Sequence, residues 1–316
     1  MECPTPCGSA VVLSAPCIVA NTLTLMETAG LLLSRCVRTA YPGFWALISA
    51  QVIPAEKLRP HLHEDTAMVL AQHCEHVLQI FASFLLPAHS VVGERLVVVM
   101  ELAPHGDLSQ AINSRWAGSF WAPRPTSSQL LDMARQLTCG LKNLHGRSLM
   151  HRDIKPLNVL VFDEGILKHA DLGLSKQMDP SVSSRIHTRG LGTIWYVAPE
   201  VAAGLYSARA DLYSLGCMLA EIDFDNILPV FFMQYKERMK TTDSKAYKML
   251  ENLAPSAYDE MFKNLVIDIA TQQAARRCPL LGVIIDILVR RESRTRASLE
   301  DVLAMLDVGE VRWLVV

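Results

Sequence analysis

The sequence predicts an α+β fold in two lobes, because strand-like segments come first along the chain and helix-like segments follow them. Short apolar runs dominate residues 30–104, whereas apolar residues recur at helical spacing from about residue 107 onward. The chain has 316 residues, of which 50% are hydrophobic and 20% are charged. This composition is typical of a globular protein with two domains or one large domain of two lobes.

Four apolar runs predict the strands of the first lobe. A helical segment is expected at residues 60–73, between the second and third of these runs. The runs read CVRTA (36–40), FWALISAQVI (44–53), VLQIFASFLL (77–86) and RLVVVMEL (95–102).

The second lobe is predicted to be mainly helical. The segments ADLYSLGCMLAEI (210–222) and SLEDVLAMLDV (298–308) have helical periodicity, and residues 151–200, which precede both, predict short strands and loops. A third helix is expected at residues 127–145, where the apolar positions fall on one face. These positions are 130, 131, 134, 137, 141 and 144.

A polar loop lies between two apolar runs in the stretch SLMHRDIKPLNVLVF (148–162). This crowding of charged and polar side chains between strand-like segments favours a site with chemistry over an ordinary solvated loop. The polar residues are His151, Arg152, Asp153, Lys155 and Asn158.

The residues after this loop predict a β-hairpin that gathers its polar groups. NVLVF and ILKHA flank an Asp-Glu-Gly turn at residues 163–165, and Asp171 follows directly. A hairpin returns its two ends to one place, so Asp153, Asn158 and Asp171 are expected to converge. Two carboxylates and a carboxamide oxygen suit Mg²⁺, and Lys155 suits a phosphate. This is the equipment that phosphoryl transfer needs.

At this point the sequence resembles the eukaryotic protein kinase family, of the serine/threonine type, from about residue 30 to residue 306. HRDIKPLN is similar to the kinase catalytic loop, and DLG is similar to the metal-binding DFG with Leu in place of Phe. GTIWYVAPE resembles the end of the activation segment, and VVVMELAPHGDL resembles the strand and hinge that hold adenine. RASLEDVL resembles the last helix of the family. The arginine of that helix, here Arg296, would pair with the glutamate of APE, here Glu200.

The resemblance implies a bilobed protein-kinase-like fold with a small β-rich N-lobe at residues 30–104 and a larger helical C-lobe at 105–306. Residues 1–29 would be an N-terminal extension and 307–316 a C-terminal tail. Asp153 would orient the attacking hydroxyl and accept its proton, and Lys155 would neutralise the γ-phosphate of ATP.

Further site residues follow from the same resemblance. Asn158 and Asp171 would hold Mg²⁺ beside ATP. The backbone of Glu101 and Ala103 would bond adenine, with Met100 as the gatekeeper side chain.

The N-lobe departs from the family's pattern in the parts that bind phosphate. Aligning Val37 with the valine after the glycine-rich loop leaves only Gly30 of its glycines, and Arg35 occupies another glycine position. Gln51 occupies the position of the phosphate-binding lysine, and Gln carries no charge. Charge-assisted hydrogen bonds are about twice as strong as neutral ones, so this substitution weakens phosphate binding.

The helix acid that normally pairs with the lysine is Glu64 or Asp65, depending on the direction of counting. With-no-lysine kinases take a lysine from the last glycine position of the phosphate loop, which Arg35 matches here. We therefore expect Arg35, or otherwise Lys57, to supply the missing charge.

Several other residues have interpretations of their own. His151 is expected to be a buried structural histidine. Arg152 would bind a phosphate that an upstream kinase adds to the activation segment, with Thr188 preferred over Ser183 and Ser184 as the acceptor. The arginine pairs 276–277 and 290–291 are expected to be solvated helix ends.

We favour an active protein serine/threonine kinase that uses ATP and Mg²⁺ on protein substrates. A pseudokinase that acts as a scaffold or regulator is the alternative, and a small-molecule phosphotransferase of related fold is a third. The net charge of −2 does not favour nucleic acid or a membrane as a partner. The eight cysteines include no CxxC pair, which disfavours zinc. Without a clear secretion signal they are expected to be reduced thiols in an intracellular, cytoplasmic protein.

Overall fold

The computed structural model divides the chain into two compact units. The strand unit takes its described residues from Met1–His73 and Leu78–Ala103, and the helical unit takes them from Cys74–Val77 and Pro104–Val316. The extension at 1–29 and most of the helix expected at 60–73 lie outside the described residues. The structure describes residues 35–38, 45–52, 71, 73–86, 95–172, 176–177, 194–202, 206–224 and 255–308.

The strand unit contains a four-stranded antiparallel sheet with the order β1-β2-β4-β3. All four predicted strands are confirmed, with ends within three residues of the expected ones. β-Branched residues in these runs favour extended backbone. The strands are β1 (Arg35–Arg38), β2 (Trp45–Val52), β3 (Ile80–Leu86) and β4 (Arg95–Glu101).

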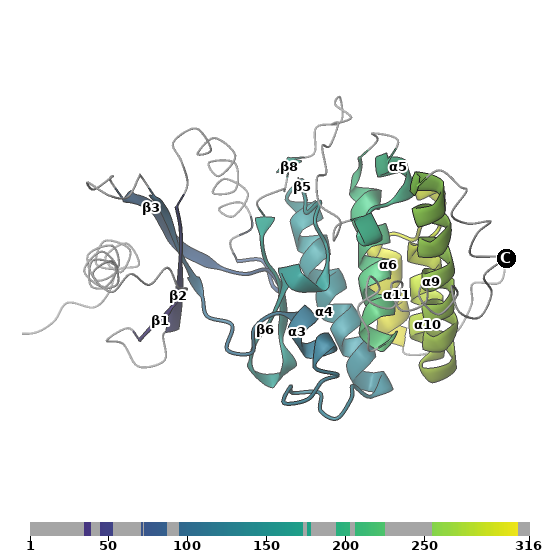
Figure 1. Cartoon of the computed structure of the whole chain (residues 1–316), viewed down its shortest axis with the longest axis horizontal. Coiled ribbons are helices and arrows are strands. Elements are labelled where there is room, and N and C mark those ends of the chain that lie inside the picture. The colour runs from purple at the N-terminus through teal and green to yellow at the C-terminus, as the bar shows by residue number, and fades with distance from the viewer. Residues whose placement is uncertain are drawn as a thin grey trace, which may run out of the picture. The chain divides into compact units, whose positions relative to one another are not determined.

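The helical unit is built around α6 (Ala208–Phe224), in which every residue from Ala210 to Asp223 is buried. Helices α4, α9 and α10 pack against it (Figure 1). A Cβ on Gly282 of α10 would lie 2.5 Å from Ala275 Cα, so glycine lets α10 approach α9 closely. The other helices are α3 (Leu108–Asn113), α4 (Ser127–Gly146), α5 (Pro199–Ala202), α9 (Pro255–Arg277), α10 (Pro279–Leu288) and α11 (Leu299–Val308).

Helix α4 begins at a capping box, in which Thr126 and Gln129 each accept a hydrogen bond from the other's backbone N–H. Its apolar face is buried as predicted, although Leu131 is only partly buried. Met133 is fully buried and was not predicted, because the buried stripe is wider than the six apolar positions indicated.

The short elements of the helical unit include the predicted hairpin. Its strands β6 (Val159–Val161) and β7 (Leu167–His169) pair antiparallel across the turn η3 (Asp163–Gly165). Gly165 has φ +75° and packs under Phe120, where a Cβ would lie 2.6 Å from the ring. The remaining short elements are β5 (Leu149–Met150), β8 (Lys176–Gln177), η2 (Pro156–Asn158), η5 (Ile194–Tyr196) and η6 (Ser293–Thr295).

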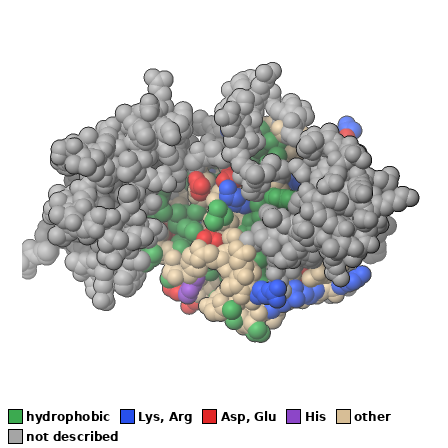
Figure 2. Space-filling view, viewed as in Figure 1, with side chains coloured by type: hydrophobic (Ala, Val, Ile, Leu, Met, Phe, Trp, Pro, Cys, Tyr) green, Lys and Arg blue, Asp and Glu red, His purple; other side chains and the backbone are tan. Residues whose placement is uncertain are grey.

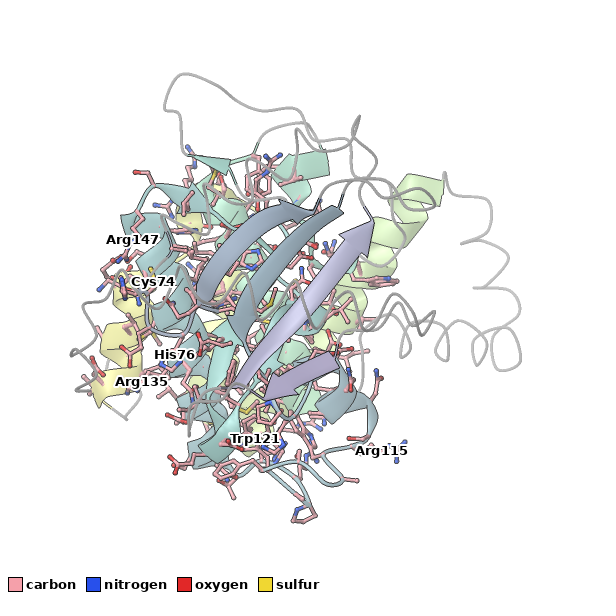
Figure 3. All side chains as sticks on the ribbon, turned by 90° about the vertical axis from the view of Figure 1, so that its left-hand side faces the viewer. Cys74, His76, Arg115, Trp121, Arg135 and Arg147 are labelled. Atoms are coloured by element: carbon pink, nitrogen blue, oxygen red, sulfur yellow. The ribbon has the colours of Figure 1, made fainter. Side chains whose placement is uncertain are left out.

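The segment Cys74–Val77 belongs to the helical unit although the chain on both sides of it belongs to the strand unit. His76 O accepts the backbone N–H of His169 at 2.9 Å, and Asn143 Nδ2 donates to Glu75 O at 3.1 Å. Figure 3 shows Cys74 and His76 along the same side of the helical unit as Arg147. The segment therefore adds its backbone to the edge of the β6–β7 hairpin.

One predicted surface feature is wrong. Arg277 was expected at a solvated helix end, but its guanidinium donates to the buried Asp223 Oδ1 at 2.7 Å and also to Pro125 O. The cation is held because a buried carboxylate needs a charged partner. Arg290 fits the expectation better, since its side chain is 47% exposed.

The described surface mixes side-chain types. Figure 2 shows Lys and Arg side chains along the lower edge of this face, and apolar side chains are exposed in small patches. Among the residues that the structure describes, the exposed large apolar side chains are those of Phe120, Leu157, Ile166 and Val308. Within the described parts of the chain, no helix combines the length and the apolar character that crossing a membrane requires.

We predict that Gly140→Ala destabilises the helical unit. The added Cβ would lie 2.5 Å from His76 O and 2.7 Å from His169 Cδ2, and neither neighbour is the end of a flexible chain. Overpacking of this kind costs about 1–3 kcal/mol. Urea unfolding measures the loss. Gly146→Ala is the matched control on the same helix, because a Cβ there meets nothing within 4 Å. Equal stabilities of the two variants would contradict the prediction.

Candidate active site

The polar loop, residues 151–158, ends in the turn η2 and connects β5 to β6. Val159 lies opposite His169 in the hairpin, so the residues just outside this pair meet. The N–H of Ala170 donates to Asn158 O at 2.9 Å, which places Asp171 next to the end of the polar loop. The hairpin thus brings together residues that are 13 positions apart (171 − 158 = 13) in the sequence.

Asp153 is 7% exposed, and its two carboxylate oxygens are in different environments. Oδ2 accepts hydrogen bonds from Lys155 Nζ at 2.6 Å and from Asn158 Nδ2 at 2.8 Å. Oδ1 is buried and has no hydrogen-bond partner among the described residues. One oxygen is therefore fixed by two donors, and the other is an acceptor whose partner is not among the described residues.

Asn158 and Asp171 have the oxygen ligands that a divalent cation requires. Asn158 Nδ2 donates to Asp153 O and Oδ2, which leaves the side-chain carbonyl as an acceptor. Asp171 is exposed and has φ +57°, a conformation that Asp tolerates better than most residues. The described residues contain no cluster of three or more His, Cys, Asp or Glu side chains that could hold a metal. Mg²⁺ needs fewer protein ligands when phosphates and waters supply the rest, so this pair fits it.

Asp211, in the first turn of α6, holds the polar loop in place. Its carboxylate accepts the backbone N–H groups of His151 and Arg152, each at 2.9 Å. It also accepts His145 Nε2 at 2.8 Å and the hydroxyl of Tyr206. Burial alone would raise the pKa of Asp211, but the hydrogen bonds from His145 and Tyr206 and the nearby imidazoles lower it overall. The sequence pattern placed Asp211 on a helix and did not reveal these partners.

His151 and Arg152 stand directly before Asp153 and differ in their surroundings. His151 is completely buried, as expected of a structural histidine. Arg152 has φ +71°, and its guanidinium lies 5.2 Å from the ring centroid of Tyr206, a cation–π distance. The candidate phosphate acceptors Ser183, Ser184 and Thr188 lie outside the described residues.

The segment that ends at Glu200 is fastened to the helices by buried polar groups. The hydroxyl of Tyr196 donates to Glu221 Oε2 at 2.5 Å, and Ser214 Oγ donates to Tyr196 O at 2.7 Å. Lys263 is 7% exposed and donates to Val197 O. Sequence reasoning missed Lys263, because a lysine in a helix that carries several charges gives no sign of burial.

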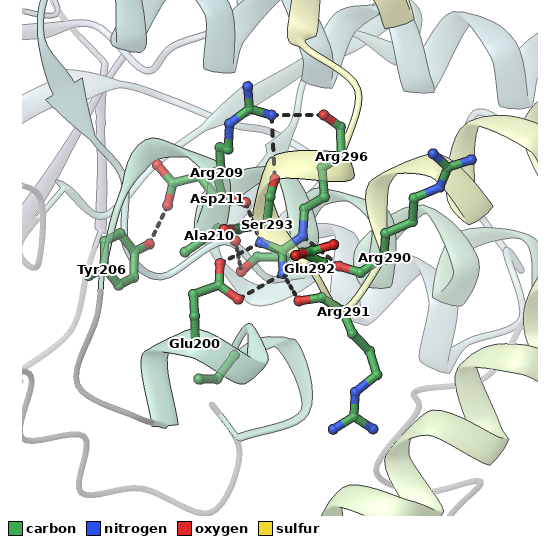
Figure 4. A network of polar contacts seen from close by, with 12 residues as sticks. Glu200, Tyr206, Arg209, Ala210, Asp211, Arg290, Arg291, Glu292, Ser293 and Arg296 are labelled. Atoms are coloured by element: carbon green, nitrogen blue, oxygen red, sulfur yellow. Dashed lines mark hydrogen bonds and ion pairs between the residues drawn. The ribbon is translucent and has the colours of Figure 1, made fainter.

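The predicted pair of Arg296 and Glu200 is present (Figure 4). Nη1 and Nη2 of Arg296 donate to the two oxygens of Glu200 at 2.5 and 2.7 Å. The remaining donors reach the carbonyls of Arg209, Arg290 and Arg291 at 2.8–3.2 Å. All five N–H groups of this buried guanidinium are thus paired.

The strand unit holds the other predicted site residues. The N–H of Glu101 donates to Gln79 O at 3.1 Å, and Glu101 Oε1 accepts the N–H of Gln79 at 2.6 Å. The N–H of Glu101, one of the backbone groups expected to bond adenine, is therefore engaged within the strand unit. Met100 and Ala103 are both partly buried.

The residues predicted near the phosphates are only partly covered by the structure. Arg35 and Val37 lie on β1 opposite Ile48 and Ala46, and Gln51 lies on β2 opposite Leu96. The backbone pairing of these strands fixes their register in the sheet. Gly30, Lys57, Glu64 and Asp65 lie outside the described residues.

Comparisons with known proteins agree with this geometry. A model of the protein kinase domain matches residues 48–305. A probable cell division protein kinase of Encephalitozoon cuniculi (strain GB-M1) is 37% identical over 121 residues, which cover 37% of this chain and 43% of that protein. Cyclin-dependent kinase C-2 C of Arabidopsis thaliana is 42% identical over 101 residues (31% and 16% of the two chains). Cyclin-dependent kinase 2 of Caenorhabditis elegans is 44% identical over 89 residues (28% and 24%). The chain spans less than half the length of these relatives.

We predict that Arg296→Met strongly destabilises the protein. Removing the cation leaves Glu200 and several carbonyls without donors, and breaking a buried ion pair in this way costs about 3–5 kcal/mol. Urea unfolding measures the change. Arg294→Met is the matched control, because Arg294 pairs with Glu292 while 82% exposed and such pairs contribute at most about 1 kcal/mol. A small effect of Arg296→Met, similar to that of the control, would refute this account of the network.

Proposed function

Because the chain belongs to the protein kinase domain family, we propose that it is an ATP-dependent protein serine/threonine kinase. The observation that carries the proposal is the asymmetric environment of Asp153. Lys155 and Asn158 fix its Oδ2, and its Oδ1 is an acceptor that has no partner among the described residues. This is the arrangement that a group needs if it is to orient a hydroxyl for attack on a phosphate.

In the proposed reaction, the hydroxyl of a protein serine or threonine donates a hydrogen bond to Asp153 Oδ1. The hydroxyl oxygen forms a bond to the γ-phosphorus of ATP, the bond from that phosphorus to the β–γ bridging oxygen breaks, and ADP leaves. The hydroxyl proton passes to Asp153. Lys155 lies 2.6 Å from Asp153 and offsets charge on the transferring phosphoryl group.

Asn158 and Asp171 are the residues that would hold Mg²⁺. The metal, when bound, neutralises phosphate charge and orients the leaving group. The contribution of this chain is to keep the Asn158 amide oriented by two hydrogen bonds to Asp153, so that its carbonyl remains free to act as a ligand.

Protein substrates are the proposed partners, since the segment 194–200, which resembles the end of a kinase activation segment, is fastened to the helices through Tyr196 and Lys263. An upstream kinase acting on the activation segment is a further proposed partner, because Arg152 could pair with a phosphate. We also propose an intracellular location. The four cysteines among the described residues, Cys74, Cys139, Cys217 and Cys278, are free thiols, which suits a reducing compartment.

A pseudokinase is the second candidate, and Gln51 is the observation that favours it. It stands where the family has a phosphate-binding lysine, on a strand that pairs with both β1 and β4. A neutral amide gives less phosphate stabilisation than an ammonium group. Such a protein would bind partners through the kinase surface and transfer no phosphate.

We predict that the protein transfers labelled γ-phosphate from Mg-ATP to itself or to a generic protein substrate, and that Asp153→Asn reduces transfer by about 10²-fold or more. Asp163→Asn is the matched control, because Asp163 is 83% exposed on the hairpin turn. It should keep full transfer. Folded protein with no transfer above the Asp153→Asn background would favour the pseudokinase.

We also predict that Arg35→Ala weakens the binding of Mg-ATP by about tenfold or more, since a charge-assisted contact to phosphate would be lost. Isothermal titration measures the affinity. Arg38→Ala is the control on the same strand, because it removes an equal charge at a position that the resemblance does not place at the phosphates. Unchanged affinity in Arg35→Ala would exclude Arg35 as the replacement for the lysine.

A further inference from the structure

Two histidine rings lie together beside the catalytic residues and take no part in the proposed chemistry. His151 and His169 are both 0% exposed, with ring centroids 5.5 Å apart and planes at 68°. Each ring has one buried nitrogen without a partner among the described residues. These nitrogens are Nε2 of His151 and Nδ1 of His169. Buried polar groups are rarely left unpaired, so this pair requires an explanation.

The other nitrogen of each ring identifies where the proton is. His169 Nε2 lies 2.9 Å from Leu137 O, which can only accept, so Nε2 carries the proton and Nδ1 has a lone pair. His151 Nδ1 accepts the backbone N–H of Asp153 at 3.4 Å, so its proton is on Nε2. Both rings are completely buried, and the partner of one nitrogen in each ring assigns the role of the other, so geometry alone gives each ring one donor and one acceptor.

One ring is therefore left with a buried donor and its neighbour with a buried acceptor. We infer that one buried water bridges the two rings, accepting a hydrogen bond from His151 Nε2–H and donating one to His169 Nδ1. A bridging water is a common partner for two polar groups that lie near each other in a protein interior. The water satisfies both nitrogens at once, whereas its absence would leave two buried groups unpaired.

This bridge makes His169 a positioning residue for Asp153. A chain of hydrogen bonds then runs from Leu137 O in α4 through His169, the water and His151 to the backbone N–H of Asp153. The backbone of His169 is itself held by His76 O at 2.9 Å. Helix α4, strand β7 and the polar loop are thereby tied together through side chains, in addition to the backbone pairing of the hairpin.

The first test is nuclear magnetic resonance of the full chain labelled with ¹⁵N at histidine. We expect both His151 and His169 to be protonated at Nε2 only, and the His151 Nε2–H resonance to move in His169→Leu. His105→Leu is the matched control, because His105 is an exposed imidazole whose partner is Asp163, and it should leave that resonance in place. An Nδ1–H tautomer in either ring of the unaltered protein would overturn the inference. So would an unmoved His151 resonance in His169→Leu. If His169→Leu does not fold, the test rests on the tautomers of His151 and His169 in the unaltered protein.

The second test is kinetic and rests on the proposed function. We expect His169→Leu to lower kcat about tenfold with little change in KM for ATP, because Asp153 is less well positioned. His169→Gln, whose amide can donate to Leu137 O and accept from the bridging water, should recover part of the loss. Equal losses in both variants would refute the positioning effect. If the unaltered protein transfers no phosphate, the proposed function fails, and the resonance measurement still decides whether the two rings are bridged.

Discussion

The buried carboxylate of Asp211 is the constraint on which the candidate site depends. A charge in the interior is tolerated only when donors surround it, and here they come from α4, from the polar loop and from Tyr206 ahead of α6. Two of the donors are successive backbone N–H groups, of His151 and Arg152, so the carboxylate fixes the direction of the chain as it enters the polar loop. The orientation of Asp153 follows from that direction.

Helix α6 extends this control to the rest of the helical unit. Ser214 and Glu221, one and nearly three turns after Asp211, bind Tyr196 and so hold the segment expected to receive protein substrates. Asp223, at the far end, is bound by Arg277. A single buried helix thus fixes the polar loop through its first turn and the segment 194–200 through Ser214 and Glu221. Its buried acids explain why so many cations and hydroxyls point toward it.

The sequence predicted those parts of the fold and of the candidate site that depend on residues close together in the chain. The hairpin, the crowding of Asp153, Lys155 and Asn158, and the buried helix faces depend on neighbours within about 20 residues. The Arg296–Glu200 pair was reached only through resemblance to the kinase family. The burial of Lys263 and Arg277, and the meeting of His151 with His169, could not be predicted. Their partners come from distant elements, and nothing in the local spacing of polar residues distinguishes a buried cation from a solvated one.

The segment Cys74–Val77 has a consequence for how the molecule can be divided. The helical unit is discontinuous in sequence, because a short piece from between two strands of the other unit completes the edge of its hairpin. A fragment that started at Pro104 would lack the carbonyl of His76 and would expose the backbone N–H of His169. A fragment of the helical unit, or a chimera in which one unit is replaced by that of a related protein, must therefore keep Cys74–Val77 together with the helices. A substitution in Cys74–Val77 therefore changes the helical unit, although this segment lies between two stretches of the strand unit in the sequence.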